Sequence, residues 1–271
     1  MPRKARSIEE GRRTCIDLVK LGYITYHHLK SEWKIRIEME RDASAITLYH
    51  ARGARSFRVL WSLHELKLRN FSLFTMPFPP RLFVPEYLKI NLLGTIPLMT
   101  DSENPAVRMT ESCACPVYLE EKYGSPNPRS LLVVRPYERD YGAYLNWLFH
   151  ADATLTFPQT LKLRYTVHEP ERGLHQAGVD YGKWYIARLK MLDHALDDDR
   201  QYLCEDRFTL ADICVTYALL LGSSNVLGFD KEYTTKTQKY LKRMIARPAF
   251  KAAQAQEKRS AEEFKAGGSK L

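Results

Sequence analysis

The sequence predicts an α/β domain followed by an all-helical domain. Three observations support this order. Short apolar segments with strand-like alternation lie between residues 46 and 109, separated by helical patterns. After residue 135, apolar residues recur at helical spacing without a further strand pattern. The segment between them contains Ser125-Pro126-Asn127-Pro128, a composition typical of a linker.

The predicted α/β domain begins with a strand and a buried helix. Residues 46–49 alternate in the way a strand does, and a break follows at Gly53. Val59, Leu63 and Leu66 then stand at i, i+4 and i+7, and their apolar neighbours broaden the same face. This spacing predicts an amphipathic helix with one side in the core.

The rest of this domain is predicted as a short series of strands and helices. A second strand covers 71–76, and a helical stretch after a Pro-rich loop ends near Asn91. A strand over 96–100 and its hairpin partner over 106–109 precede a helix over 112–123. The resulting βαβ-α-ββ-α order is an α/β module.

The second half carries two helical signals. One is a row of apolar residues on a single helical face: Tyr181, Tyr185, Leu189, Leu192 and Leu196. The other is Thr209-Leu210-Ala211-Asp212, a capping box flanked by Phe208 and Ile213 at the hydrophobic-staple positions. We therefore expect Asp212 to stabilise a helix start and to take no part in catalysis.

Composition and charge exclude several classes of protein. The chain has 271 residues, 45% of them hydrophobic, with 13 Gly and 14 Pro, which is a globular composition. Of the net charge of +9, residues 1–45 carry three units and residues 251–271 two. No Lys/Arg run with interleaved aromatic residues occurs between these ends, so we expect no nucleic-acid partner.

Membrane and metal signals are absent from the sequence. No apolar run approaches the length of a membrane span, so we expect a protein outside the membrane. The five cysteines lack C-x-x-C spacing and the eight histidines lack ligand spacing, so we expect neither a disulfide framework nor a metal site.

Three stretches in this order resemble the soluble glutathione S-transferase family over residues 46 to about 255. They are Arg55-Ser56-Phe57-Arg58-Val59-Leu60-Trp61, then Leu93-Gly94-Thr95-Ile96-Pro97-Leu98 followed by Thr110-Glu111-Ser112, and Arg207-Phe208-Thr209-Leu210-Ala211-Asp212-Ile213. The resemblance implies a thioredoxin-like domain followed by an all-helical domain, which together make the glutathione S-transferase fold. It also implies glutathione as co-substrate and a homodimer.

The resemblance implies four glutathione-binding residues. It makes Pro97 a cis-proline, which leaves the backbone of Ile96 to pair with the cysteinyl part of glutathione as a short added strand. Ser112 begins a helix whose free amides and dipole suit the γ-glutamyl carboxylate. Glu111 is placed to pair with the α-amino group of the same ligand. The alternatives are an edge-strand proline, an ordinary N-cap serine and an exposed glutamate.

The thiol-activating group is expected in the turn after the first strand. At the positions where the family usually has a catalytic Ser or Cys, this chain has Ala54 and Arg55, and Ser56 follows. We expect Arg55 to stabilise the glutathione thiolate by its charge, with the Arg55 amide or the Ser56 hydroxyl as donor. In the alternative, Ser56 only caps the helix and Arg55 lies on the surface.

Two cysteines flank the start of the helix that follows Ser112. Cys115 is expected to be a small buried residue. For Cys113, a reversible mixed disulfide with glutathione stays open.

The chain therefore divides into five predicted segments. They are an N-terminal extension (1–45), a glutathione-binding domain (46–124), a linker (125–135), a helical domain (136–255) and a tail (256–271). The tail ends in Ser269-Lys270-Leu271, the tripeptide of peroxisomal import. We expect a cytoplasmic protein, with the peroxisome as a second location in a eukaryote.

The predicted function is that of a glutathione transferase in detoxification. It would activate the glutathione thiol for attack on a small hydrophobic electrophile. The alternative is a non-catalytic glutathione-binding or protein-interaction module on the same fold, because no standard Ser or Cys stands at positions 54 and 55.

Overall fold

A computed structural model describes residues 45–124, 131–198 and 200–269. The N-terminal extension with Cys15, the Ser125–Pro128 segment and the last two residues of the C-terminal tripeptide lie outside the described residues. The described chain divides into two compact units. Unit 1 contains residues 45–54, 70–108 and 257–269, and unit 2 contains 55–69 together with the described residues from 109 to 256.

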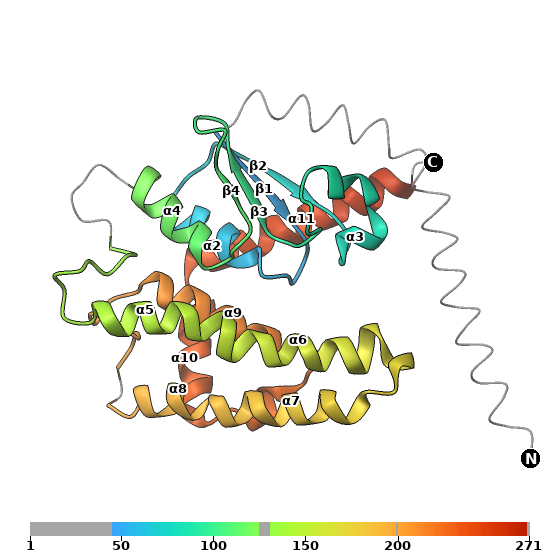
Figure 1. Cartoon of the computed structure of the whole chain (residues 1–271). Helices are drawn as coiled ribbons and strands as arrows, with labels where there is room; N and C mark the ends of the chain where they lie inside the picture. The colour runs from blue at the N-terminus through green and yellow to red at the C-terminus, as the bar shows by residue number, and fades with distance from the viewer. Residues whose placement is uncertain (1–44, 125–130, 199, 270–271) are drawn as a thin grey trace, which may run out of the picture. The chain divides into compact units, whose positions relative to one another are not determined.

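Four strands form one mixed sheet in the order β2-β1-β3-β4 (Figure 1). The strands are β1 (Ile46–His50), β2 (Phe71–Thr75), β3 (Leu98–Asp101) and β4 (Arg108–Met109). β1 runs parallel to β2, with Leu48 opposite Leu73, and antiparallel to β3, with Leu48 opposite Met99. β1 is therefore a central strand, and all five of its residues are buried.

The core of unit 1 is aromatic on one side of the sheet. Tyr49 of β1 stacks on Phe74 of β2 with ring centroids 5.5 Å apart, and it meets Tyr87 at 5.6 Å. Ile96 and Leu98 join the same buried cluster. Tyr87 belongs to η1 (Pro85–Lys89), which follows α3 (Pro80–Phe83), so both lie in the stretch for which the sequence predicts short helical structure.

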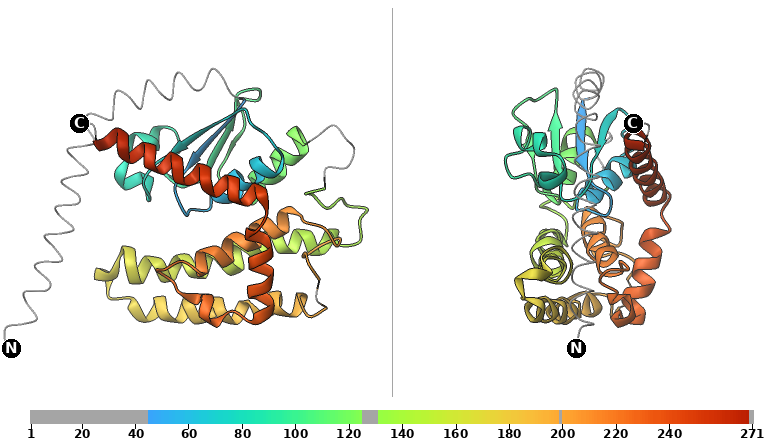
Figure 2. Two further views of the ribbon diagram at one scale, coloured as in Figure 1. Left: turned by 180° about the vertical axis from the view of Figure 1, so that it is seen from behind. Right: turned by 90° about the vertical axis from the view of Figure 1, so that its right-hand side faces the viewer.

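The C-terminal part of helix α11 (Pro248–Ser269) belongs to unit 1 from residue 257 onward. Figure 2 shows this part of α11 running along the sheet. Glu257 Oε1 accepts a hydrogen bond from the Gly53 amide at 3.0 Å, and Ser260 donates to Thr75 at 2.6 Å. Segments about 200 residues apart in sequence therefore build the same unit.

Three strands are shorter than the sequence predicts. β2 ends at Thr75 and not at residue 76. β3 begins at Leu98 and not at Ile96, and β4 covers only 108–109 of the predicted 106–109. Pro97 explains the later start of β3, because proline has no amide to donate to a strand ladder. The Ile96–Pro97 peptide bond is cis, which confirms that prediction for Pro97.

Unit 2 is helical, which confirms the predicted helical second half (Figure 1). Its helices are α2 (Phe57–Glu65), α4 (Ala114–Tyr123), α5 (Tyr141–Phe149), α6 (Phe157–Leu163), α7 (His175–Arg188), α8 (Lys190–Ala195), α9 (Leu210–Gly222), α10 (Thr235–Ile245) and the first part of α11. π-helical turns η2 (His150–Thr156) and η3 (Arg164–His168) extend α5 and α6, and short 3-10 turns η4 (Pro170–Arg172) and η5 (Phe229–Glu232) join other helices.

Helix α2 packs inside unit 2 although it connects two strands of unit 1. Its Trp61 is fully buried and lies 5.7 Å from Phe208 and 5.0 Å from Phe250, measured between ring centroids. Trp61 also donates its indole N–H to Glu65 at 2.9 Å. The predicted apolar face is therefore buried from Phe57 to Leu63, whereas Leu66, which follows the end of α2, is only partly buried.

The predicted capping box starts α9. The Thr209 amide donates to Asp212 Oδ2 at 2.9 Å, and the box is complete. Phe208 and Ile213, at the staple positions, are both buried. Asp212 also accepts from the Leu203 amide and from the Tyr240 hydroxyl, so its role in this structure is to organise the start of α9.

The apolar row predicted over 181–196 is split between two helices. α7 ends at Arg188 and α8 begins at Lys190, with Leu189 between them. Tyr185, Leu189, Leu192 and Leu196 are buried, as the spacing predicts. Tyr181 is only half-buried, and its ring stacks on that of Trp184.

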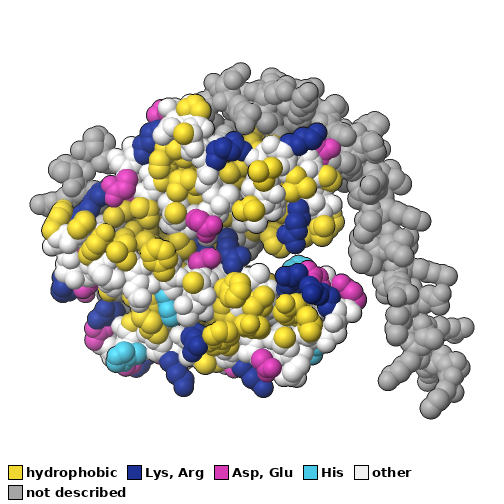
Figure 3. All heavy atoms as spheres, viewed as in Figure 1, with side chains coloured by type: hydrophobic (Ala, Val, Ile, Leu, Met, Phe, Trp, Pro, Cys, Tyr) yellow, Lys and Arg dark blue, Asp and Glu magenta, His cyan; other side chains and the backbone are white. Residues whose placement is uncertain are grey.

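Among the helices in the part of the chain that the structure describes, none is both long and apolar enough to cross a bilayer. On the face shown in Figure 3, Lys and Arg side chains lie singly or in small groups among acidic and hydrophobic ones.

Candidate functional site

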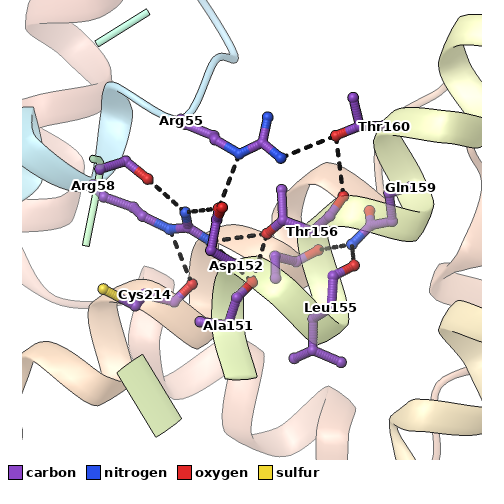
Figure 4. Close-up of polar contacts among 11 residues, drawn as sticks. Arg55, Arg58, Ala151, Asp152, Leu155, Thr156, Gln159, Thr160 and Cys214 are labelled. Atoms are coloured by element: carbon purple, nitrogen blue, oxygen red, sulfur yellow. Dashed lines mark hydrogen bonds and ion pairs between the residues drawn. The ribbon is translucent and has the colours of Figure 1, made fainter. Parts of the chain in front are cut away.

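The predicted site residues are divided between the two units. Ile96 and Pro97 belong to unit 1, whereas Arg55, Ser56, Glu111 and Ser112 belong to unit 2. Within unit 2, a network of polar contacts joins Arg55 and Ser112 through two residues that the sequence analysis did not select, Arg58 and Asp152 (Figure 4).

Arg58 is the centre of this network. Its side chain is completely buried, and its guanidinium has five hydrogen-bond acceptors for its five N–H groups. These are Ser112 Oγ at 2.7 Å, Asp152 Oδ1 at 2.7 Å, the Ala151 carbonyl at 3.1 Å, Thr156 Oγ1 at 2.8 Å and the Cys214 carbonyl at 3.3 Å. Its guanidinium carbon also lies 4.7 Å from the centre of the Tyr217 ring.

Asp152 is shared by two arginines. Oδ1 accepts from Arg58 Nη1 at 2.7 Å and from Arg55 Nε at 2.9 Å. Burial opposes ionisation of Asp152, but the charges of Arg58 and Arg55 outweigh it and hold the pKa of the carboxyl below its ordinary value. Two cations and one anion leave this cluster with a net positive charge.

The π-helical turn η2 supplies three of these partners. Ala151, Asp152 and Thr156 lie within its seven residues. In such a turn the amide bonds the carbonyl five residues back, which widens the helix and is frequent at functional sites. Here the Ala151 carbonyl accepts from both Arg58 and the Thr156 hydroxyl, the latter at 2.6 Å.

Arg55 is not the surface residue of the alternative interpretation. Only 29% of its side chain is exposed, and besides Asp152 it donates to Thr160 Oγ1 at 3.1 Å. Ser56 is completely buried at the N-cap position of α2, but its side chain makes no capping hydrogen bond. A purely capping role for Ser56 is therefore not what the structure shows.

Glu111 and Ser112 stand just before α4 with opposite exposure. Glu111 is exposed, whereas Ser112 is only 3% exposed. The Glu111 carbonyl accepts the amides of Ala114 and Cys115, which closes the first turn. Arg58 donates to Ser112 Oγ, so the Ser112 oxygen is an acceptor in this contact.

Cys113 lies between Ser112 and α4 and is partly exposed. Cys214, in α9, is completely buried. The influence of the Cys214 side chain, assisted by the charge of Arg58 and by Ser112 and opposed by burial, lowers the pKa of the Cys113 thiol below its ordinary value. Cys115 is fully buried, as expected, and burial raises the pKa of its thiol.

In unit 1, the loop before Ile96 is held by polar side chains. Tyr87 donates its hydroxyl to the Thr95 carbonyl at 2.9 Å, and Asn91 Nδ2 donates to the same carbonyl at 2.9 Å. Ile96 and Pro97 are both buried. These two hydrogen bonds fix the position of the Thr95 carbonyl, one residue before the cis Ile96–Pro97 bond.

One local signal could have revealed Arg58. It is the charged residue within the apolar run Phe57–Leu63, on a helix whose face the pattern already placed in the core. Arg and Asp are rarely buried unless they are paired, so a buried Arg predicts a partner carboxylate. Nothing in the sequence shows that this partner is Asp152, 94 residues away.

A family model and curated relatives match this chain. The model described as "Glutathione S-transferase, C-terminal domain" matches residues 187–248. Glutathione S-transferase 2 of Schizosaccharomyces pombe is 28% identical over 225 residues, which cover 76% of this chain and 93% of the relative. Glutathione S-transferase 1 of the same organism is 27% identical over 216 residues, which cover 75% and 92%.

Solved structures match the fold as well. The glutathione transferase URE2P5 from Phanerochaete chrysosporium has a TM-score of 0.69 at 22% identity, with 82% of this chain and 98% of that chain covered. URE2P6 from the same organism, solved in complex with oxidized glutathione, has a TM-score of 0.67 at 24% identity, with 80% and 98% covered. These likenesses confirm the predicted architecture of a sheet-containing N-terminal region and a helical C-terminal domain.

Proposed function

We propose that this chain is a glutathione transferase that activates the glutathione thiol for attack on a small hydrophobic electrophile. The family match, the curated relatives and the solved structures support its membership of the soluble glutathione S-transferase family. The names of the relatives support transferase activity with glutathione in general. The electrophile, a homodimer, a detoxifying role and a cytoplasmic location are further parts of the proposal.

One observation carries the proposal, the buried Arg58–Ser112 hydrogen bond directly beside the exposed Glu111. It orients the Ser112 oxygen toward the cation. A carboxylate at the start of α4 would also meet the positive end of the helix dipole. We assign the γ-glutamyl end of glutathione to Glu111 and Ser112, and the cysteinyl backbone to Ile96 beside Pro97.

Thiol activation is assigned to Arg55, with its backbone amide or the Ser56 hydroxyl as donor. A thiolate attacks an electrophile and a thiol does not, so the enzyme must favour the charged form. The net positive charge of Arg55, Arg58 and Asp152 supports this assignment, because an adjacent cation lowers a thiol pKa.

The test is glutathione-dependent turnover of an aryl halide, an isothiocyanate and a peroxide by the purified full chain. We expect turnover of at least one of them, and we expect Arg55→Ala to lower kcat/KM about tenfold at neutral pH, equal to about 1.4 kcal/mol. The same substitution should move the rising limb of the pH profile to higher pH. Ser56→Ala should lower kcat/KM without that move if the hydroxyl is only a donor.

The control is Arg172→Ala, which removes an exposed arginine paired with Glu169. It should leave both the rate and the pH profile as they are. An unchanged pH profile in Arg55→Ala would refute the role of Arg55. Retention on immobilised glutathione without turnover of any electrophile would instead favour the non-catalytic glutathione-binding module.

A further inference from the structure

Two polar side chains, one from the π-helical turn η2 and one from helix α6, contact the guanidinium of Arg55 (Figure 4). Arg55 Nε donates to Asp152 Oδ1 at 2.9 Å, and Arg55 Nη2 donates to Thr160 Oγ1 at 3.1 Å. The two partners lie 97 and 105 positions further along the chain. Because the two bonds start from different nitrogen atoms, they fix both the position and the direction of the guanidinium plane.

The widened turn explains how one guanidinium reaches two residues that are eight positions apart in the same helical stretch. Eight residues of a regular α-helix exceed two full turns by about 80°. A π-helical turn contains more residues per turn, so the π-helical segment that ends at Thr156 reduces this excess. Asp152 and Thr160 therefore face the same side of the stretch, where Arg55 lies between them.

Both acceptors are held in place by hydrogen bonds of their own. Asp152 Oδ1 also accepts from Arg58 Nη1 at 2.7 Å, and Arg58 is completely buried. The Thr160 hydroxyl donates its one proton to the Thr156 carbonyl at 3.1 Å, so its oxygen is presented to Arg55 as an acceptor. Arg55 is consequently fixed by two groups that are themselves fixed.

Part of the Arg55 guanidinium stays available to an anion. Asp152 and Thr160 use two of its five N–H groups, and among the residues that the structure describes the guanidinium has no further acceptor. The side chain is 29% exposed. A cation that is already oriented stabilises an anion without the free-energy cost of being ordered first.

We propose that Asp152 and Thr160 are positioning residues, which together hold Arg55 in the orientation in which it stabilises the glutathione thiolate. The inference rests on the proposed function, because it takes Arg55 as the residue that activates the thiol. It adds to that function a role for η2 and α6. Asp152 lowers the positive charge of the cluster, so a role through orientation and a role through charge alone predict opposite effects of its removal.

The test measures the pKa of the glutathione thiol bound to the full chain, from the ultraviolet absorbance of the thiolate during a pH titration, and needs no electrophile. Thr160→Val removes the acceptor and keeps the shape of the side chain. We expect it to raise the pKa of the bound thiol by about half a unit, since Arg55 keeps only its bond to Asp152. At neutral pH, kcat/KM should fall about threefold, which is the same change.

Two further variants separate orientation from a general structural effect. Asp152→Ala should raise the pKa of the bound thiol by about one unit, as Arg55→Ala should, whereas a mere loss of negative charge would lower it. In the double variant Arg55→Ala/Thr160→Val, the thiol pKa should equal that of Arg55→Ala, because Thr160 acts through Arg55.

Thr166→Val is the matched control. The Thr166 hydroxyl donates to the Lys162 carbonyl four residues back at 2.8 Å, just as the Thr160 hydroxyl donates to that of Thr156. Thr166 is half-buried like Thr160, and no arginine of the described chain donates to it. Thr166→Val should therefore keep the thiol pKa and the rate of wild type.

The outcomes distinguish failure of the inference from failure of the proposed function. Glutathione that does not bind, or a bound thiol whose pKa is unchanged in Arg55→Ala, would overturn both. A raised pKa in Arg55→Ala with an unchanged pKa in Thr160→Val would overturn the inference alone. A lowered pKa in Asp152→Ala, or effects of Arg55→Ala and Thr160→Val that simply add, would do the same.

Discussion

Arg58 shows how a single residue can join elements that are distant in sequence. Its guanidinium contacts the start of α4, the π-helical turn η2 and the α9 backbone from a position on α2. A buried guanidinium is tolerated only when its N–H groups are bonded and its charge is paired. Here both conditions are met, so Arg58 is held in one geometry and holds Ser112 in turn.

Replacement of Arg58 by methionine should therefore lower the free energy of unfolding. Arg58→Met removes the five hydrogen bonds and leaves Asp152 with Arg55 as its arginine partner. We expect a loss of about 3 kcal/mol or more in the free energy of unfolding, because breaking a buried pair leaves polar groups unsatisfied. Urea unfolding followed by circular dichroism measures it.

The matched control is Arg172→Met, at an exposed arginine 2.8 Å from Glu169. Solvent screens an exposed ion pair, so it contributes little to stability and this variant should unfold almost as wild type does. Equal losses in the two variants would mean that the Arg58 network does not stabilise unit 2 beyond an ordinary surface pair.

The first turn of helix α9 contains a buried aspartate, Asp212, and its protonation makes the stability of the protein depend on pH. Asp212 accepts hydrogen bonds from the Thr209 and Leu203 amides and the Tyr240 hydroxyl. Burial raises the pKa of Asp212 to about 6, and the hydrogen bonds oppose this rise without cancelling it. An acid whose pKa is higher in the folded state than in the unfolded chain favours folding at low pH, where it is protonated.

That favourable contribution should disappear as pH rises from about 4 to about 6. The folded state binds the proton in this window and the unfolded chain has released it, so the free energy of unfolding falls with pH. Two pKa units correspond to about 3 kcal/mol. We expect the stability of wild type relative to Asp212→Asn to fall by about that amount between pH 4 and pH 7, measured by urea unfolding.

Asp180→Asn controls for the general effect of removing an aspartate. Asp180 is exposed on α7, where Gln176 donates to it. The stability of Asp180→Asn, measured over the same pH range, is the baseline against which the difference for Asp212→Asn is compared. A flat difference for Asp212→Asn would contradict the raised pKa. The ¹³C shift of the Asp212 carboxyl, which should titrate near pH 6, is an independent check on wild type.

The two compact units are not consecutive segments of the chain. Unit 1 takes residues 257–269 from the C-terminal end, and unit 2 takes α2 from between two strands of unit 1. Glu257, from the C-terminal segment, is buried in unit 1. Its Oε1 accepts a hydrogen bond from the Gly53 amide and lies 3.2 Å from His50 Nε2. The end of the chain is therefore a structural part of unit 1.

Glu257→Ala should destabilise unit 1 by about 1 to 3 kcal/mol, because it leaves a partly buried Gly53 amide without this acceptor. Hydrogen exchange of the Gly53 amide should become faster, and urea unfolding should shift to lower concentration. Lys258→Ala, one residue on, removes a side chain that is 67% exposed, and it should cost less than about 0.5 kcal/mol. If both variants behaved alike, the tail would not be part of unit 1 in solution.

The order of elements and the helix start at Thr209 follow from the sequence, because alternation, helical spacing and a capping box act over a few neighbouring residues. The buried face of α2 was predicted for the same reason and is confirmed. The cis bond at Pro97 was implied by the family resemblance and is also confirmed. The partners of Arg58 and the place of Glu257 in unit 1 were decided by the tertiary structure. The Arg58–Asp152 and Gly53–Glu257 hydrogen bonds join residues 94 and 204 positions apart, and a contact over that distance leaves no pattern in the local sequence that would name the partner.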